Sequence, residues 1–81
     1  LGDVYKRQEL LSVGVVNNYF TCKQTARLMS IFTWDDEKMK VLRMVSNRIV
    51  DRENGKEIIK TLDSLFTQDD ARKILGITNQ W

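Results

Sequence analysis

The chain has 81 residues, of which 42% are hydrophobic and 30% charged, so it forms one small domain with a well-hydrated surface. It contains no proline and only four glycines, a composition that favours helices with short connections over a turn-rich β fold. The net charge of +2 comes from 13 basic and 11 acidic side chains that are interspersed along the chain. Because a nucleic-acid-binding domain usually gathers its basic residues on one face, we expect no nucleic acid partner.

Residue types that commonly build catalytic and metal sites are scarce. The chain has no histidine, the commonest general base and metal ligand, and Cys22 is its single cysteine. An intrachain disulfide and a cysteine cage for a metal are therefore excluded. The neighbours of Cys22 predict a small, semi-buried residue rather than a reactive thiol. With no nucleophile motif and no phosphate-binding loop either, we expect no enzyme activity, no cofactor and no metal site.

Residues 1–8 read Leu-Gly-Asp-Val-Tyr-Lys-Arg-Gln and resemble the in-frame translation of a transposase sequencing adapter. We therefore expect a foreign segment at residues 1–8, followed by a single helical domain at residues 9–81 that lacks its natural beginning. No apolar run approaches the roughly 20 residues of a transmembrane helix. The lack of a signal peptide carries no information about localisation, because the natural start of the protein would be missing.

The first half of the chain predicts three helices. Residues 9–18 are apolar without a clear period and are interpreted as the remainder of a first helix. Thr21 starts the second helix, with Gln24 at the spacing of a capping box. Thr33 starts the third and longest helix, with Asp36 at its third position. The apolar face of this third helix is formed by Met39, Leu42, Val45 and Ile49.

The second half predicts a turn and two further helices. The turn spans residues 51–55, because its Asn-Gly pair suits positive backbone angles. Thr67, with Asp70 three residues on, starts the last helix, and Gly76 takes the position of its C-cap. The helix between the turn and Thr67 is marked by Ile58, Leu62, Leu65 and Phe66. The whole pattern predicts an all-α fold, a compact array of about four to five short helices.

An aromatic-Thr-x-x pattern recurs at residues 20–24, at residues 32–36 as FTWDD and at residues 66–70 as FTQDD. In each copy the Thr oxygen can accept a backbone N–H, which contributes about 1 kcal/mol, and the acids face the positive end of the helix dipole. The phenylalanine of each copy is expected to turn inward. The acids after Trp34 lack the alternating spacing and the glycine of a calcium loop. We therefore interpret the repeat as a device that starts helices, and not as a carboxylate site.

The order of features from residue 18 to residue 76 resembles the family called domain of unknown function 4476. The resemblance rests on an aromatic-Phe-Thr-Cys-x-Gln start at residues 19–24, Leu-Met-Ser-x-Phe at residues 28–32, the acidic start at residues 33–39 and Arg-Ile-Val-Asp-x-x-Asn at residues 48–54. The family implies an all-helical domain, often within bacterial proteins that carry export signals, and hence an extracytoplasmic location. It implies no known activity, so no catalytic residue is carried over.

The function favoured by these observations is a non-catalytic helical module that binds a protein partner or neighbouring domains. Trp34 and Trp81 are its candidate interface residues, because tryptophan is enriched at interface hot spots. The alternative reading of Trp34 is a partly buried residue in the first turn of a helix.

The alternative function is a helix-turn-helix-like DNA-binding fragment, with residues 66–78 as its first helix and turn. Against it, Arg72 stands where that motif has a small residue. A second candidate for the helix-turn-helix motif, at residues 26–30, would lead into a recognition helix whose first turn contains three acids. In a complex with DNA these acids would face the phosphates and be repelled by them.

Overall fold

The computed structural model describes residues 19–77. Within that range the chain forms α-helices α2 (Cys22–Met29), α3 (Asp35–Val45), α4 (Lys56–Ile59) and α5 (Leu65–Leu75), and 3-10 helices η1 (Ser46–Arg48) and η2 (Arg52–Asn54). The predicted all-α fold is confirmed. The adapter-like segment at residues 1–8, the helix expected at residues 9–18 and the candidate interface residue Trp81 lie outside the described residues.

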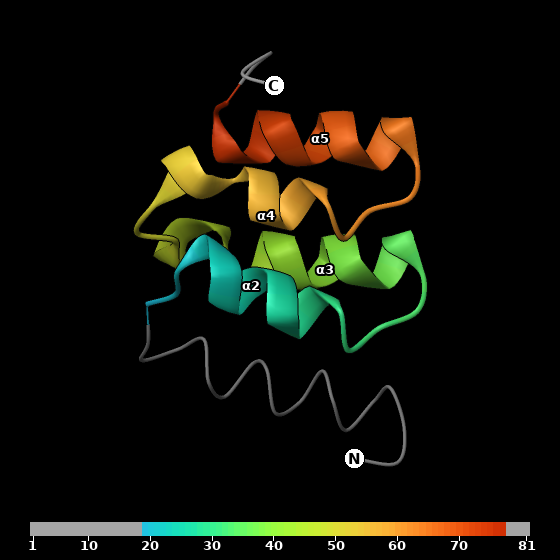
Figure 1. Cartoon of the computed structure of the whole chain (residues 1–81), viewed down its shortest axis with the longest axis horizontal. Coiled ribbons are helices and arrows are strands. Elements are labelled where there is room, and N and C mark those ends of the chain that lie inside the picture. Colours follow the sequence, from blue (N-terminus) through green and yellow to red (C-terminus); the bar gives the residue numbers. More distant parts are fainter. Residues whose placement is uncertain (1–18, 78–81) are drawn as a thin grey trace.

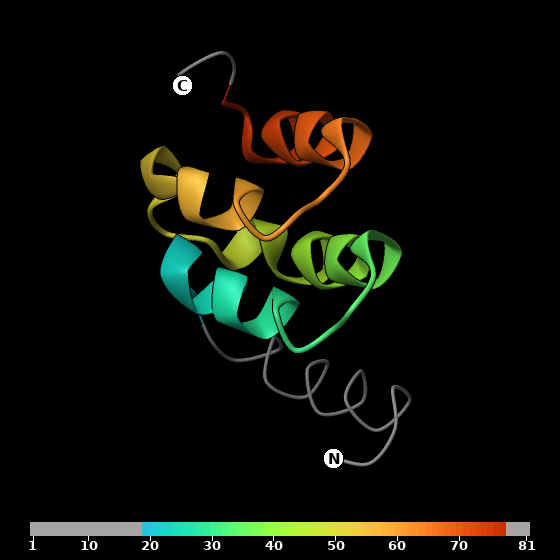
Figure 2. The ribbon, with the colours of Figure 1, turned by 45° about the vertical axis from the view of Figure 1, so that its right-hand side comes forward.

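The four α-helices form two stacked hairpins, α2 with α3 and α4 with α5 (Figure 1). The helices α3 and α5 run in one direction, and α2 and α4 run in the opposite one. The helix α2 packs against α3 and α4, and α5 packs against the same two helices. The α2–α3 and α4–α5 loops consequently lie at the same end of the molecule, which a second view also shows (Figure 2).

The core lies where the two hairpins meet. The apolar face predicted for the third helix is buried, although α3 ends at Val45 and Ile49 reaches the core after η1. Phe32 is also buried, and Phe20 packs partly against the core, as predicted for both. The largest fully buried side chains are Met29, Leu42, Ile58, Leu75, Val41, Val45, Thr25 and Cys22. Burial of this apolar area stabilises the fold at about 25 cal/mol per Å².

The helix α2 begins as the sequence predicts. The hydroxyl of Thr21 accepts the N–H of Gln24 at 3.1 Å, and the side chain of Gln24 accepts the N–H of Thr21 at 2.9 Å. A short parallel bridge joins this helix start to the segment after α3, because the Phe20 N–H donates to the Arg48 carbonyl at 2.8 Å and the Val50 N–H donates to the Phe20 carbonyl at 3.0 Å.

The start predicted for the third helix at Thr33 and Asp36 is wrong by one residue. The N-cap of α3 is Trp34, whose N–H donates to the Glu37 carboxylate at 3.4 Å, while Thr33 is exposed in the preceding loop. The loop must bury Phe32, which is 3% exposed, within a few residues of the end of α2. Core packing therefore decides where α3 begins, and Asp36 becomes an exposed residue of its first turn.

The start predicted for the last helix at Thr67 and Asp70 is also wrong. The N-cap of α5 is Ser64, whose hydroxyl accepts the Phe66 N–H at 3.1 Å. Thr67 instead lies inside the first turn, where its hydroxyl donates to the Ser64 carbonyl at 3.0 Å. Leu62 is buried soon after α4 ends, and the chain must then turn at once into α5. As a result Phe66 is 86% exposed, contrary to the inward position expected for it.

The two glycines of the described chain have different roles. Gly76 ends α5 with a left-handed φ of 73°, as predicted for a C-cap. The positive backbone angle expected at the Asn-Gly pair is wrong for its glycine, because Gly55 has φ −56° and follows η2. Gly55 is needed for space: a Cβ there would lie 2.6 Å from Cδ1 of Ile77.

Candidate functional site

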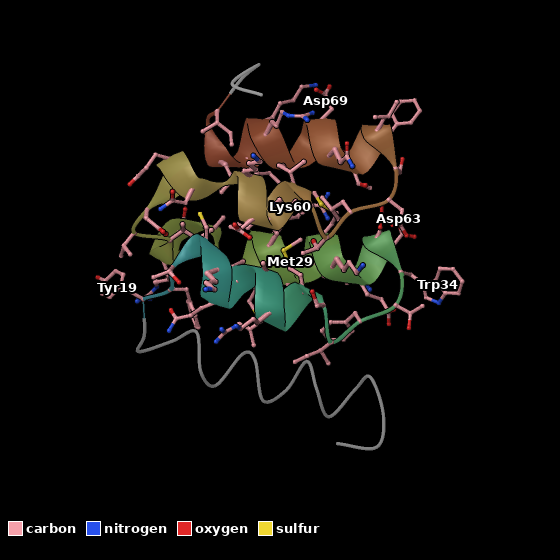
Figure 3. All side chains as sticks on the ribbon, viewed as in Figure 1. Tyr19, Met29, Trp34, Lys60, Asp63 and Asp69 are labelled. Atoms are coloured by element: carbon pink, nitrogen blue, oxygen red, sulfur yellow. The ribbon has the colours of Figure 1, made fainter. Side chains whose placement is uncertain are left out.

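The most distinctive surface of the molecule is an exposed apolar edge formed by Trp34, Leu65 and Phe66. These side chains are 70%, 80% and 86% exposed, respectively. Trp34 is the N-cap of α3, and the other two residues open α5, about 30 residues later in the chain. Figure 3 shows Trp34 and Asp63, which precedes α5, at the same end of the molecule, with Tyr19 at the opposite end. We call these three residues the apolar edge.

A single carboxylate joins the two helix starts that carry the apolar edge. Asp35, next to Trp34, accepts the N–H of Asp63 at 3.1 Å and the N–H of Ser64 at 2.9 Å. Its Oδ2 atom also accepts the hydroxyl of Thr67. Because the first N–H groups of a helix have no partner within the helix, this carboxylate satisfies donors at the start of α5 from outside. The position of the apolar edge is therefore fixed by hydrogen bonds of a charged group.

Two further side chains hold the α4–α5 loop against the rest of the molecule. The ammonium group of Lys38, on α3, donates to the Thr61 carbonyl at 2.7 Å. The side-chain amide of Gln68, on α5, donates to the Leu62 carbonyl at 2.9 Å. The loop backbone is thus bonded to α3 and to α5. A surface held in this way loses little conformational entropy when a partner binds.

The hydrogen bonds to Asp35 also lower the pKa of its carboxyl group. Burial raises the pKa of the Asp35 carboxyl, but the hydrogen bonds from Thr67, Ser64 and Asp63, together with the charge of Lys38, outweigh burial and leave the pKa below its ordinary value of 3.8. The group is therefore a carboxylate at neutral pH, with its oxygen atoms already engaged. This is the environment of an anchoring group and not that of a general base, whose pKa would be raised.

The two segments that carry the apolar edge are acidic although the chain as a whole is basic. Residues 31–37 and 61–70 contain six acidic side chains and no Lys or Arg. Three of the acids, Asp36, Asp63 and Asp70, are exposed and form no ion pair or side-chain hydrogen bond with the described residues. We call these three residues the acidic rim. Asp36 and Asp70 line one shallow hollow between α3 and α5.

Basic side chains also border this region. Lys38, directly after Glu37, reaches the Thr61 carbonyl at 2.7 Å. Arg72 lines a shallow hollow beside Leu65 and Phe66. Lys40 and Arg43 line the same hollow as Asp36 and Asp70. Lys40 and Asp70 occupy equivalent positions in the second turns of α3 and α5, so cations border the acidic rim on the sides of both helices.

The opposite end of the molecule contains the thiol and the other shifted carboxylate. Burial, followed by the charge and hydrogen bonding of Asp51, raises the pKa of Cys22 to about 12. Its Sγ donates to the Asp51 carbonyl at 3.0 Å, and its N–H donates to the Asp51 carboxylate at 2.7 Å. Cys22 is fully buried, more than the semi-buried position predicted, and its protonated thiol is unsuited to nucleophilic chemistry.

Hydrogen bonding from Asn54 is the largest influence on the pKa of Asp51, and with the N–H of Cys22 it holds that pKa below the ordinary value despite burial. Across residues 19–77 no group of three or more His, Cys, Asp or Glu is arranged to hold a metal ion. None of the helices in the same range combines the length and the apolar character of a membrane span.

Of the two tryptophans predicted as interface residues, the structure describes one. Trp34 is strongly exposed, so the reading of a partly buried first-turn residue is wrong, and Trp81 lies outside the described residues. Sequence reasoning missed Leu65 and Phe66 as surface residues, and it missed Asp35 as their anchor. One signal was present in the sequence: three consecutive acids follow Trp34, and acids stand on both sides of Phe66.

The comparisons with known proteins identify a family and give no function. No curated protein and no solved structure matches the chain. A protein-family model, described as domain of unknown function (DUF4476), matches residues 5–75 and so covers more than half of the chain. The match includes all four motifs on which the resemblance was based. The chain belongs to the family of domain of unknown function 4476.

Proposed function

We propose that the domain is a non-catalytic protein-interaction module and that the apolar edge is its contact surface. The observation that carries the proposal is the exposure of Trp34, Leu65 and Phe66 at the starts of α3 and α5, which Asp35 joins. Single exposed apolar residues are common on protein surfaces, but a group of large ones at one place marks an interaction site. Tryptophan in particular is enriched among residues that dominate binding energy.

The bonding around the apolar edge supports the same proposal. Asp35 ties the start of α3 to the start of α5, and Lys38 and Gln68 hold the intervening loop. The hydrophobic residues therefore sit on well-anchored backbone, which limits the entropy lost on binding. The carboxylates with shifted pKa, Asp35 and Asp51, accept hydrogen bonds that start helices. Their roles are structural, in line with a module that binds and does not catalyse.

No observation favours the DNA-binding alternative. The helix α3, which would be the second helix of one candidate motif, opens with Asp35, Asp36 and Glu37. Carboxylates at that position repel phosphates, whereas recognition helices place neutral or basic residues there. We therefore keep a protein partner as the proposal.

Peptide selection on the immobilised protein tests the proposal without requiring an identified partner. Random peptides displayed on phage are enriched on the unmodified chain and are then measured against two matched variants. Leu65→Ser/Phe66→Ser removes one aliphatic and one aromatic residue from the apolar edge. Tyr19→Ser/Val50→Ser removes the same pair of types at the opposite end, where both side chains are also exposed.

We expect the enriched peptides to bind the unmodified chain and the Tyr19→Ser/Val50→Ser variant alike, and to bind the Leu65→Ser/Phe66→Ser variant at least about tenfold more weakly. Equal binding to both variants would show that the apolar edge is not the contact surface. A selection that enriches no peptide would likewise reject the proposed function.

A further inference from the structure

We infer that the apolar edge takes a peptide segment in which apolar residues are flanked by Lys or Arg, which rests on the proposed function. The inference concerns the chemistry of the partner. It follows from the acidic rim around the apolar edge, Asp36, Asp63 and Asp70, and from the absence of any base in residues 31–37 and 61–70.

The acids of this region exceed what the helices need. Acids in the first turn of a helix are stabilising because they face the positive end of its dipole, and this accounts for Asp35, Asp36 and Glu37 at α3. The first turn of α5 contains no acid. Asp63 precedes its N-cap, and Asp70 lies in its second turn, where the dipole contributes little. Two carboxylates thus stand beside the apolar edge without a role in starting a helix.

Neither of these carboxylates forms an ion pair with the described residues, although Lys40 and Arg43 line the same hollow as Asp70. Among the acids of residues 61–70, Asp69 forms an ion pair with Lys73 at 3.8 Å, whereas Asp63 and Asp70 form none within residues 19–77. Charged groups at the border of an interface mainly set specificity and the rate of encounter, while apolar residues at its centre supply affinity.

The apolar edge and the acidic rim together match one class of partner. A basic amphipathic segment presents apolar side chains to Trp34, Leu65 and Phe66 and cations to the acidic rim. An acidic segment, a nucleic acid or an anionic membrane would meet carboxylates first and would be repelled. A neutral apolar segment would gain only from the apolar edge.

Three synthetic peptides of about 12 residues test this inference. Each has leucine at helical spacing on one face, and the other face is all Lys, all Gln or all Glu. Binding of the fluorescently labelled peptides is measured by anisotropy. We expect the Lys peptide to bind at least about fivefold more tightly than the Gln peptide, and the Glu peptide to bind most weakly. The differences in affinity among the three peptides should become smaller at high salt.

Matched variants locate the charge effect. Asp63→Asn/Asp70→Asn removes two charges from the acidic rim, and Glu53→Gln/Glu57→Gln removes two exposed charges that lie outside residues 31–37 and 61–70. We expect the first variant to lose roughly fivefold in affinity for the Lys peptide and less than twofold for the Gln peptide. The second variant should change both affinities by less than twofold.

The outcomes separate the inference from the proposed function. If the Gln peptide binds as tightly as the Lys peptide, and both are lost in Leu65→Ser/Phe66→Ser, the basic partner is rejected while the interaction module stands. If no peptide depends on the apolar edge, both proposals are rejected. Sedimentation of the protein alone completes the test: a dimer that disappears in Leu65→Ser/Phe66→Ser would make a second copy the occupant and would also reject the basic peptide.

Discussion

The two ends of the α3–α5 pair are held by side chains of opposite charge, which bind backbone groups that have no partner within a helix. At the start of both helices, Asp35 accepts backbone N–H groups of the α4–α5 loop. At the other end, the guanidinium of Arg52 donates to the carbonyls of Ile74 and Leu75 at 3.2 Å and 3.3 Å, and to the Ser46 carbonyl at 2.5 Å. An anion therefore binds the N–H ends of the helices and a cation binds their carbonyl ends, as the helix dipole favours.

The two ends differ in what they expose. The Asp35 end carries the apolar edge and the acidic rim on anchored backbone. At the Arg52 end, the exposed apolar residues Tyr19 and Val50 adjoin the parallel bridge, and Arg48 lies over the ring of Tyr19 at 5.7 Å from its centroid. That tyrosine already has a cationic neighbour from its own chain. Both ends therefore carry anchoring hydrogen bonds, and the proposed contact surface lies at the Asp35 end.

Of the two anchoring side chains, Arg52 is expected to have the larger effect on stability. Arg52→Met leaves three backbone carbonyls without their charged donor and should lower the free energy of unfolding by about 3 kcal/mol. Arg43→Met, at an exposed position of α3, serves as the control and should stay within about 0.5 kcal/mol. Urea denaturation followed by circular dichroism measures both. Equal effects of the two variants would contradict an anchoring role for Arg52.

The Asp35 end should lose less, because its carboxylate is partly exposed to water. Asp35→Ala is expected to lower the free energy of unfolding by about 2 kcal/mol through the loss of charge-assisted hydrogen bonds to Asp63, Ser64 and Thr67. The neighbouring variant Asp36→Ala loses only a favourable position in the helix dipole and should cost about 0.5 kcal/mol. An equally large loss in both variants would show that the helix dipole, and not the hydrogen bonds of Asp35, accounts for the effect.

The pH dependence of this effect has a defined sign. The pKa of Asp35 is lower in the folded than in the unfolded chain, so its contribution to stability is complete above the ordinary value of 3.8 and is lost as the pH falls through the folded value. The stability difference between the unmodified chain and Asp35→Ala should therefore be constant near neutral pH and shrink below about pH 4. The subtraction removes the parallel contribution of Asp51, whose pKa is also lowered. A difference that persists unchanged at lower pH would show that the carboxylate charge is irrelevant.

A smaller effect tests the packing beside Arg52. Gly55→Ala places a Cβ 2.6 Å from Cδ1 of Ile77 and 3.1 Å from the Arg52 carbonyl oxygen, and should cost about 1.5 kcal/mol. Added Ile77→Val removes the Cδ1 atom and should recover part of this loss. Gly76→Ala, which is strained by a positive φ and meets no neighbour, should cost about 1 kcal/mol and gain nothing from Ile77→Val. A double-mutant cycle by denaturation measures this coupling, and zero coupling would reject the steric explanation.

The smallest stability effect is expected on the apolar edge itself. Phe66→Ser should change the free energy of unfolding by no more than about 0.5 kcal/mol, because Phe66 is 86% exposed. Phe32→Ala, at the equivalent position of the other FT-x-DD copy, is the control and should cost about 3–5 kcal/mol because Phe32 is buried. Thermal denaturation distinguishes the two. A large loss in Phe66→Ser would mean that this side chain serves the fold and not a partner.

Local signals in the sequence were sufficient for several elements. The capping box of Thr21 and Gln24 and the C-cap at Gly76 depend on neighbours within a few residues, and the structure has both. The apolar face of α3 was predicted because its period of three to four residues is a property of the sequence alone. The similar strings FTWDD and FTQDD were misleading, since they occupy different registers: the first crosses the start of α3 and the second lies wholly inside α5.

What the sequence alone determined is therefore the all-α class, the buried face of the longest helix, and the caps whose partners are three or four residues away. Tertiary structure decided the starts of α3 and α5, since burial of Phe32 and of Leu62 outweighs a local Thr cap worth about 1 kcal/mol. It also decided the apolar edge, because the hydrogen bonds that hold it join Asp35 to Ser64 and Thr67 across about 30 residues. Such contacts cannot be predicted from a periodic pattern in the sequence, because they depend on which helix ends the packed core brings together.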